Sequence, residues 1–209
     1  MGNALHVEET QSSARAASQT DFEQRNAPRY TLLIRAAKLV CEAGEYLCVI
    51  RDVSESGISV RTFHRLPDTR GMVVELQNGD RHELETIWQE DDRAGFRFVQ
   101  PVDTARIIAS PSRFAKRAIR LNLTAQAQVR TLDGRYVDAE IVDLSQQGAK
   151  ITCLCRFALD ERVKISAPGL PETNAKVRWR KHGGCGLIFE DTYQYGDLAR
   201  IAAHLQRPK

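Results

Sequence analysis

Ile50-Arg-Asp-Val-Ser-Glu-Ser-Gly-Ile58 occurs twice in this sequence, the second time as Ile141-Val-Asp-Leu-Ser-Gln-Gln-Gly-Ala149. Both stretches share the frame Asp-x-Ser-x-x-Gly, and the two copies lie 91 residues apart. Repetition at a fixed period indicates that one structural unit occurs more than once. The frame consists of Asp52, Ser54 and Gly57 in the first copy and of Asp143, Ser145 and Gly148 in the second.

The same offset relates residues far outside these two stretches, without any insertion or deletion. These identities predict two tandem domains of one fold. We interpret the paired tryptophans and phenylalanines as core residues, since large aromatic side chains are usually buried. The pairs are Arg29 with Arg120, Leu32 with Leu123, Arg65 with Arg156, Trp88 with Trp179, Gly95 with Gly186, and Phe98 with Phe189.

Short strand-like runs separated by turn residues fill both halves. In the first half they are Thr31–Val40, Glu45–Val53, Gly57–Thr62, Met72–Leu76, Arg81–Gln89 and Gly95–Val99. In the second half they are Asn122–Thr131, Arg135–Val142, Ala149–Leu154, Arg162–Ser166, Thr173–Arg180 and Gly184–Glu190. Asn78-Gly79 and Asp133-Gly134 are typical of two-residue hairpin turns. Helices are expected at 103–109 and at 195–206, the second with Leu198, Ile201, Ala202 and Leu205 on one face.

Six short strands in each half favour closed barrels, because closure leaves no exposed edge strand. We therefore predict a mainly β protein with two tandem six-stranded antiparallel barrels, each followed by a short α-helix. The expected divisions are a disordered tail at residues 1–20, a first barrel with its arm at 21–110, and a second barrel with a C-terminal helix at 111–209. Strand alternation would direct Asp143 into the second core, so we expect either a bend at Val142 or a partner for this carboxylate.

The composition is that of an ordinary soluble protein, with 209 residues of which 42% are apolar and 27% charged. The net charge of +3 permits an anionic ligand but gives no particular support to nucleic-acid binding. No apolar run approaches the roughly 20 residues that span a bilayer. The first 20 residues lack the apolar segment of a signal peptide, and the five cysteines form no C-x-x-C pair. We therefore expect a cytoplasmic protein with reduced thiols.

The Asp-x-Ser-x-x-Gly frame has two interpretations. It places a hydroxyl close to a carboxylate, which can accept two hydrogen bonds at once and so suits the N1–H and N2–H₂ edge of guanine. Alternatively, the aspartate and serine cap their own backbone turn and bind nothing. In either case the glycine permits a positive φ or the close approach of another group.

Basic residues precede each frame by the same distance, since Arg29 and Arg120 both lie 23 residues before the aspartate. Guanidinium groups can fork onto phosphate oxygens and can stack on a purine. The recurrence of the basic residues favours a ligand-binding interpretation of the frame. These residues are Arg25 and Arg29 in the first copy and Lys116, Arg117 and Arg120 in the second.

The order Arg-x-x-x-Arg, Asp-x-Ser-x-x-Gly and Gly-x-x-Phe (Gly95–Phe98 and Gly186–Phe189) resembles the PilZ domain. The resemblance covers about residues 22–101 and 113–191. It implies a six-stranded barrel that binds the bacterial second messenger cyclic di-GMP. It further implies that the arginine arm wraps the ligand and that the Asp/Ser turn reads guanine. No cofactor besides this ligand is expected.

By this resemblance the first copy has a complete set of binding residues, namely Arg25, Arg29, Asp52, Ser54 and Gly57. The second copy departs from the pattern because Lys116 stands at the first arginine position, and lysine neither forks nor stacks as arginine does. Arg117 substitutes for it with a slip of one residue. The second site is therefore expected to be weaker or vestigial, with Lys116, Arg117, Arg120, Asp143, Ser145 and Gly148 as its residues.

The resemblance implies a cyclic di-GMP receptor that relays the second-messenger level to a partner protein in motility, exopolysaccharide or biofilm control. Because the second arm connects the two barrels, we expect a ligand there to fix the angle between them. We expect no enzyme, since the sequence shows no metal-ligand spacing, nucleophile elbow or phosphate-binding glycine loop. The alternatives are a ligand-independent PilZ adaptor and, with nucleic acid an unlikely partner, a cyclic di-GMP-dependent DNA-binding regulator.

Overall fold

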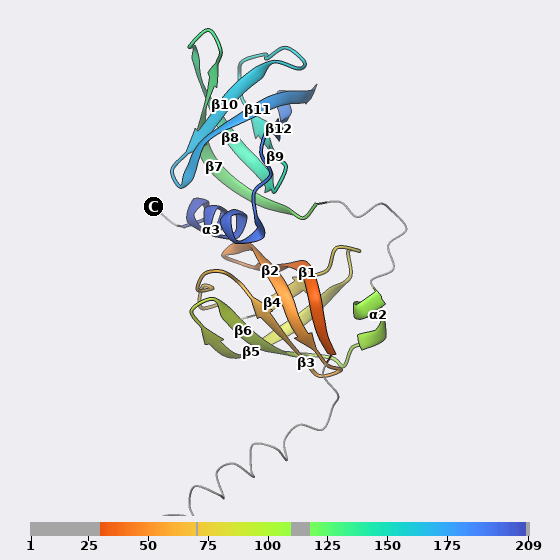
Figure 1. Cartoon of the computed structure of the whole chain (residues 1–209). Helices are drawn as coiled ribbons and strands as arrows, with labels where there is room; N and C mark the ends of the chain where they lie inside the picture. Colours follow the sequence, from red (N-terminus) through yellow and green to blue (C-terminus); the bar gives the residue numbers. More distant parts are fainter. Residues whose placement is uncertain (1–29, 70, 110–117, 208–209) are drawn as a thin grey trace, which may run out of the picture.

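The computed structural model describes residues 30–69, 71–109 and 118–207, and for residues 30–34 it describes the backbone alone. The chain forms two β-barrels, with the C-terminal helix lying between them (Figure 1). The tail expected at residues 1–20 lies outside the described residues. Among the helices of the described ranges, none is long and apolar enough to cross a membrane.

The first barrel is closed and antiparallel, with the strand order β1-β2-β3-β6-β5-β4 and β4 paired back onto β1. The Asn78-Gly79 turn joins β4 to β5, and Gly79 has the positive φ of +90° that this turn requires. A short helix, α2, follows the last strand. The elements are β1 (Tyr30–Cys41), β2 (Gly44–Val53), β3 (Gly57–Arg61), β4 (Met72–Glu75), β5 (Arg81–Glu90), β6 (Arg93–Phe98) and α2 (Thr104–Ala109).

The second barrel repeats this order of strands, as β7-β8-β9-β12-β11-β10, and ends in the longer helix α3. The prediction of two six-stranded antiparallel barrels, each followed by a short helix, is confirmed. Strands β7 and β11 begin earlier than expected. The elements are β7 (Arg120–Thr131), β8 (Tyr136–Ser145), β9 (Gly148–Thr152), β10 (Arg162–Ala167), β11 (Leu170–Lys181), β12 (Gly184–Phe189) and α3 (Tyr195–Leu205).

The repeat extends to the irregularities of the sheets. Each barrel has a register shift between its first and second strands, between its second and third, and between its fifth and sixth. In the second-to-third pair the shift falls between Ile50 and Asp52 in one barrel and between Ile141 and Asp143 in the other. A bulge inserts one extra residue and so changes the face on which the following side chains lie. These bulges therefore decide where the side chains of the site point.

Helix α3 joins the two barrels through an apolar face. Its residues Leu198 and Ala202 are buried, and Ala36 and Leu47 of the first barrel pack into the same apolar cluster as the core of the second. The side chain of Gln206, just beyond the helix, makes two hydrogen bonds to the backbone of Glu45, each at 2.9 Å. Its amide oxygen accepts from the Glu45 backbone amide, and its amide nitrogen donates to the Glu45 backbone carbonyl. The two barrels are therefore packed against each other through α3.

A polar contact reinforces this interface. The Glu45 carboxylate accepts hydrogen bonds from the backbone amide of Asn122 at 2.8 Å and from its side-chain amide at 2.9 Å. Lys38 forms an ion pair with the same carboxylate at 3.1 Å. Hydrogen bonds to charged groups are worth about 1.5–3 kcal/mol each, so Glu45 is a substantial link from the first barrel to β7.

Candidate functional site

The first repeated turn is held by its serine. The Ser54 backbone amide donates to the Gly57 carbonyl at 2.8 Å, and the Gly57 amide donates to the Ser54 hydroxyl oxygen at 3.1 Å. Ser54 is buried, and its counterpart Ser145 is buried too, with its hydroxyl donating to the Gly148 carbonyl at 3.0 Å. Both serines therefore shape the turn, and their contact with a ligand stays a prediction.

The glycines of the two turns lie where a neighbouring strand approaches closely, more so at Gly148 than at Gly57. A Cβ atom at Gly148 would lie 2.1 Å from the carbonyl oxygen of Leu187. A Cβ atom at Gly57 would lie 3.0 Å from the carbonyl oxygen of Phe96. Of the two possibilities that the sequence left open for this glycine, close approach is thus the one that the structure shows.

The aspartates of the two turns lie on the outer surface of their barrels. The register shift before Asp143 interrupts the alternation that buries Ala139 and Ile141, so that the carboxylate turns outward. It also has a partner, because Arg120 donates to it at 2.9 Å. The expectation of a bend or a partner is confirmed in both respects.

In the first barrel, four residues on adjacent strands form one row across the outer surface. Trp88 on β5 is in register with Gly95 on β6, Gly95 with Ser59 on β3, and Ser59 with Asp52 on β2. The Ser59 hydroxyl donates to an Asp52 carboxylate oxygen at 2.9 Å. A small hollow of about 90 Å³ lies along this row, and its lining also includes Ile87.

The indole of Trp88 lies flat against β6. A Cβ atom at Gly95 would be 2.1 Å from its Nε1 atom and 2.4 Å from its Cε2 atom, so that only glycine leaves room for the ring. Trp179 covers Gly186 in the same way, at 2.0 and 2.3 Å. One face of each ring is packed on a strand, and each ring forms a platform on which a base can stack.

The prediction that these two tryptophans are core residues is wrong. Trp88 is 42% exposed and Trp179 is 39% exposed, whereas Phe98 and Phe189 are buried as expected. The bulges before Trp88 and Trp179 place the indoles outside the barrels. The sequence contains a signal for this arrangement, because each tryptophan stands seven residues before a glycine of the repeat.

The second barrel has the same row with different chemistry. Trp179, Gly186, Lys150 and Asp143 are in register across four strands, so that Lys150 occupies the position of Ser59. Asp143 has a guanidinium partner, Arg120, which donates to its carboxylate at 2.9 Å. The structure brings together Arg120, Asp143 and the turn, three parts of the predicted second site.

The basic arms lie mostly outside the described residues. Arg25, Arg29, Lys116 and Arg117 belong to segments that the structure does not describe. The described chain begins at Tyr30, which is in register with Val53, while the next residue, Thr31, is in register with Asp52. The residue that follows Arg29 in sequence is therefore adjacent to the turn.

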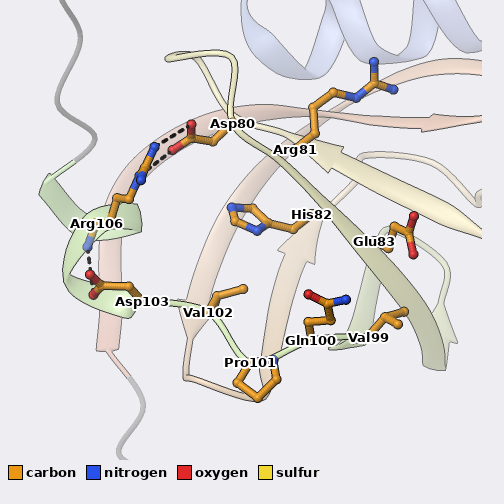
Figure 2. Close-up of a pocket in the computed structure, with 10 residues that line it drawn as sticks. All are labelled: Asp80, Arg81, His82, Glu83, Val99, Gln100, Pro101, Val102, Asp103 and Arg106. Atoms are coloured by element: carbon orange, nitrogen blue, oxygen red, sulfur yellow. Dashed lines mark hydrogen bonds and ion pairs between the residues drawn. The ribbon is translucent and has the colours of Figure 1, made fainter.

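A second hollow, of about 520 Å³, lies on another side of the first barrel between β5 and the segment leading into α2. Figure 2 shows Asp80 and Arg106 facing each other at one end of it, with the His82 ring directed inward. Arg106 donates to both carboxylate oxygens of Asp80, at 3.0 and 3.1 Å, and this pairing lowers the pKa of Asp80. The charged pair thus holds the β4–β5 hairpin to α2.

The two barrels fill the base of this region differently. In the first, the His82 ring packs edge-on against Phe98 with centroids 5.7 Å apart. In the second, Tyr193 packs on Phe189 at 5.6 Å, and its hydroxyl bonds to Thr173, the counterpart of His82. Val102 of the first barrel is the counterpart of Tyr193, so the large and the small residue have exchanged positions around the same phenylalanine. This exchange of side-chain size explains the hollow in the first barrel.

Metal binding has no support in residues 30–69, 71–109 and 118–207, where no group of three or more His, Cys, Asp or Glu side chains could hold an ion.

Comparison with known proteins gives a family match over both halves of the chain. The family described as PilZ domain matches residues 23–109 and again residues 112–207. No curated protein matches the sequence.

Three proteins of low identity are among the solved structures that match this chain. PlzA of Borreliella burgdorferi, in complex with c-di-GMP, is 10% identical, with coverage of 90% of this chain and 98% of that one and a TM-score of 0.35. YcgR of Escherichia coli, also in complex with c-di-GMP, is 13% identical, with coverage of 97% and 96% and a TM-score of 0.35. MotI of Bacillus subtilis, described as an inhibitor of motility, is 14% identical, with coverage of 84% and 97% and a TM-score of 0.37.

Proposed function

The chain belongs to the PilZ domain family through both of its barrels, and from that premise we propose that it is a receptor for cyclic di-GMP. We propose further that it relays the level of this second messenger to a partner protein. The observation that carries the proposal is the row of Asp52, Ser59, Gly95 and Trp88 beside the start of β1.

At the first site, each member of the row has a distinct task. Asp52 accepts hydrogen bonds from the N1–H and N2–H₂ donors of a guanine, while Ser59 orients the carboxylate from its other side. Trp88 offers its exposed ring face to a base. Ser54 and Gly57 act as positioning residues, since they hold the turn that carries Asp52.

Arg25 and Arg29 complete the first site in this proposal by binding phosphate oxygens and purine faces from the arm. Their proximity is supported by the register of Thr31 with Asp52. It is also supported by the second barrel, where the counterpart of Arg29, Arg120, reaches Asp143 at 2.9 Å.

The relay between the barrels runs through β7. Asn122 is in register with Asp143 and also binds the Glu45 carboxylate of the first barrel. A ligand that takes Arg120 away from Asp143 would therefore act two residues from the main polar contact between the barrels. Through this contact we expect occupancy of the second site to change the inter-barrel angle, which small-angle scattering with and without ligand would measure.

Calorimetric titration of cyclic di-GMP tests the assignment of the first site. We compare the wild-type chain with Arg25→Ala/Arg29→Ala, with Asp52→Ala and with Lys116→Ala/Arg120→Ala. Charge-assisted hydrogen bonds of about 1.5–3 kcal/mol each predict a loss of affinity of at least about tenfold for either of the first two variants.

The third variant serves as the matched control, because it removes two cations from the second site and leaves the first intact. Undiminished binding by the Arg25→Ala/Arg29→Ala variant would show that the ligand is held elsewhere. Absence of binding by the wild-type chain would leave the ligand-independent adaptor as the better function.

A further inference from the structure

The two barrels provide an internal comparison of surface charge, because every position in one has a counterpart in the other. Around the exposed tryptophan the comparison is uneven. Four positions that are neutral or acidic in the first barrel are all basic in the second. These positions are Ser59, Glu85, Ile87 and Glu90 in the first barrel and Lys150, Lys176, Arg178 and Lys181 in the second.

The four cations lie on one face of the second barrel. Lys150 is in the same row as Trp179, through Gly186. Lys176 and Lys181 lie on either side of Trp179 along β11, in register with Ile188 and Gly184 of β12. Arg178 is the extra residue of the bulge and is exposed. Lys181 lies two residues after Trp179 and so shares its face, while the extra bulge residue brings Lys176, three residues before Trp179, to that face as well.

Carboxylates neutralise this face only in part. Asp160 lies 3.2 Å from Lys176 and 3.8 Å from Arg178. Lys150 and Lys181 have no ion pair among the described residues. On the corresponding side of the first barrel, three arginines are paired with carboxylates: Arg61 and Arg93 with Asp92, and Arg97 with Glu85.

We propose that this face of the second barrel binds single-stranded nucleic acid, an activity beyond the receptor function proposed above. The phosphates bind to Lys150, Arg178 and Lys181, and an unpaired base stacks on Trp179. A basic surface with an aromatic platform is the combination by which proteins hold single strands. The net charge of +3 does not reveal this feature. It sums the charges of the whole chain, so the basic face of the second barrel is counted together with the neutralised face of the first.

The orientation of Trp179 distinguishes a single strand from other polyanions. The ring is pressed against Gly186, so it presents its face and cannot project into a bilayer as an interfacial tryptophan does. Bases within a duplex are already stacked on each other and must be extruded before they can stack on a side chain. An unpaired base needs no extrusion, and it can stack directly on the ring face that Trp179 presents.

Fluorescence polarisation with a labelled 12-nucleotide oligothymidine tests the proposal on the full chain. Three phosphate contacts predict that log K falls with log salt with a slope of about −2. Trp179→Ala should weaken binding about 5- to 150-fold, the range that base stacking contributes. Lys150→Ser/Arg178→Ile, which installs the residues of the first barrel, should reduce the slope by about 1.4.

The matched control is Arg81→Ser/Arg93→Ile, which removes the same charge from the first barrel and should leave affinity and slope unchanged. Lys181→Glu provides a further test at an exposed position and should also weaken binding. Equal losses in the control and test variants, tighter binding of the corresponding duplex, or equal retention by phosphatidylglycerol vesicles would each overturn the proposal.

Titration of cyclic di-GMP separates this proposal from the receptor function. The Lys150→Ser/Arg178→Ile variant should keep the wild-type affinity at the first site while its oligonucleotide binding falls. If the wild-type chain bound the oligonucleotide with the predicted slope but not the cyclic dinucleotide, the nucleic-acid face would stand and the receptor function would not.

Discussion

Replacing Gly95 by alanine should remove the Trp88 platform without disturbing the barrel. The new Cβ atom would lie 2.1, 2.4 and 2.9 Å from three atoms of the indole. Carbon atoms in contact are about 3.5 Å apart, so the ring must move outward by about 1.4 Å or swing away from β6. The flat stacking surface beside Asp52 is then lost.

The cost in binding follows from the contribution of one stacked base, about 1–3 kcal/mol. We therefore expect the affinity of Gly95→Ala for cyclic di-GMP to fall about 5- to 150-fold. The melting temperature should change little, because the displaced ring is already 42% exposed and alanine is easier to order in a strand than glycine.

Calorimetry measures the affinity, and tryptophan fluorescence reports on the ring itself. The chain contains two tryptophans, so a Trp179→Phe background leaves Trp88 as the sole reporter. The control is Gly186→Ala, which displaces Trp179 by the same geometry in the second barrel and should leave the first site unchanged. Wild-type affinity in Gly95→Ala, alongside a loss in Asp52→Ala, would refute a role for Trp88 in the site.

Three further predictions follow from contacts away from the row. Gln206→Ala should expose the Glu45 amide and accelerate its hydrogen exchange, because two hydrogen bonds across the interface are lost. Burial lowers the pKa of His64 in the folded state, so on acidification the unfolded state takes up the proton first. The contribution of His64 to stability should therefore be fully present above about pH 6.5 and decrease as the pH falls below that value. Thermal unfolding of His64→Phe should lack this decrease. Burial raises the pKa of Cys48 and of Cys185 to about 12, so both thiols should react with a disulfide reagent at pH 8 only after unfolding.

The fold was predictable because its determinants are local and occur twice. Turn residues such as Asn78-Gly79 specify hairpins directly, and alternation along each run identifies the strands. The constant offset between Asp52 and Asp143 then requires the two halves to share one topology. The packing of α3 between the barrels was not predictable, because an amphipathic helix shows that it has an apolar face but not which surface covers that face.

The candidate site was predictable only in part. The aspartates and glycines of the turns were identified, whereas Trp88 and Trp179 were assigned to the core. A bulge shifts the face of every following residue by one, and strand alternation alone does not reveal it. Ser59 and Lys150 were missed for a related reason, since their importance comes from cross-strand register with Asp52 and Asp143.

The position of α3 has a consequence for the order of assembly. Domains fold from the N-terminal side during synthesis, and α3 follows both barrels in the chain. The first barrel can therefore close while Ala36 and Leu47 still lack their apolar cover. Until α3 is made, the nascent chain presents a hydrophobic patch to chaperones and to other nascent copies. A truncation before Tyr195 would make that transient state permanent, so that aggregation of the shortened chain would report on the interface.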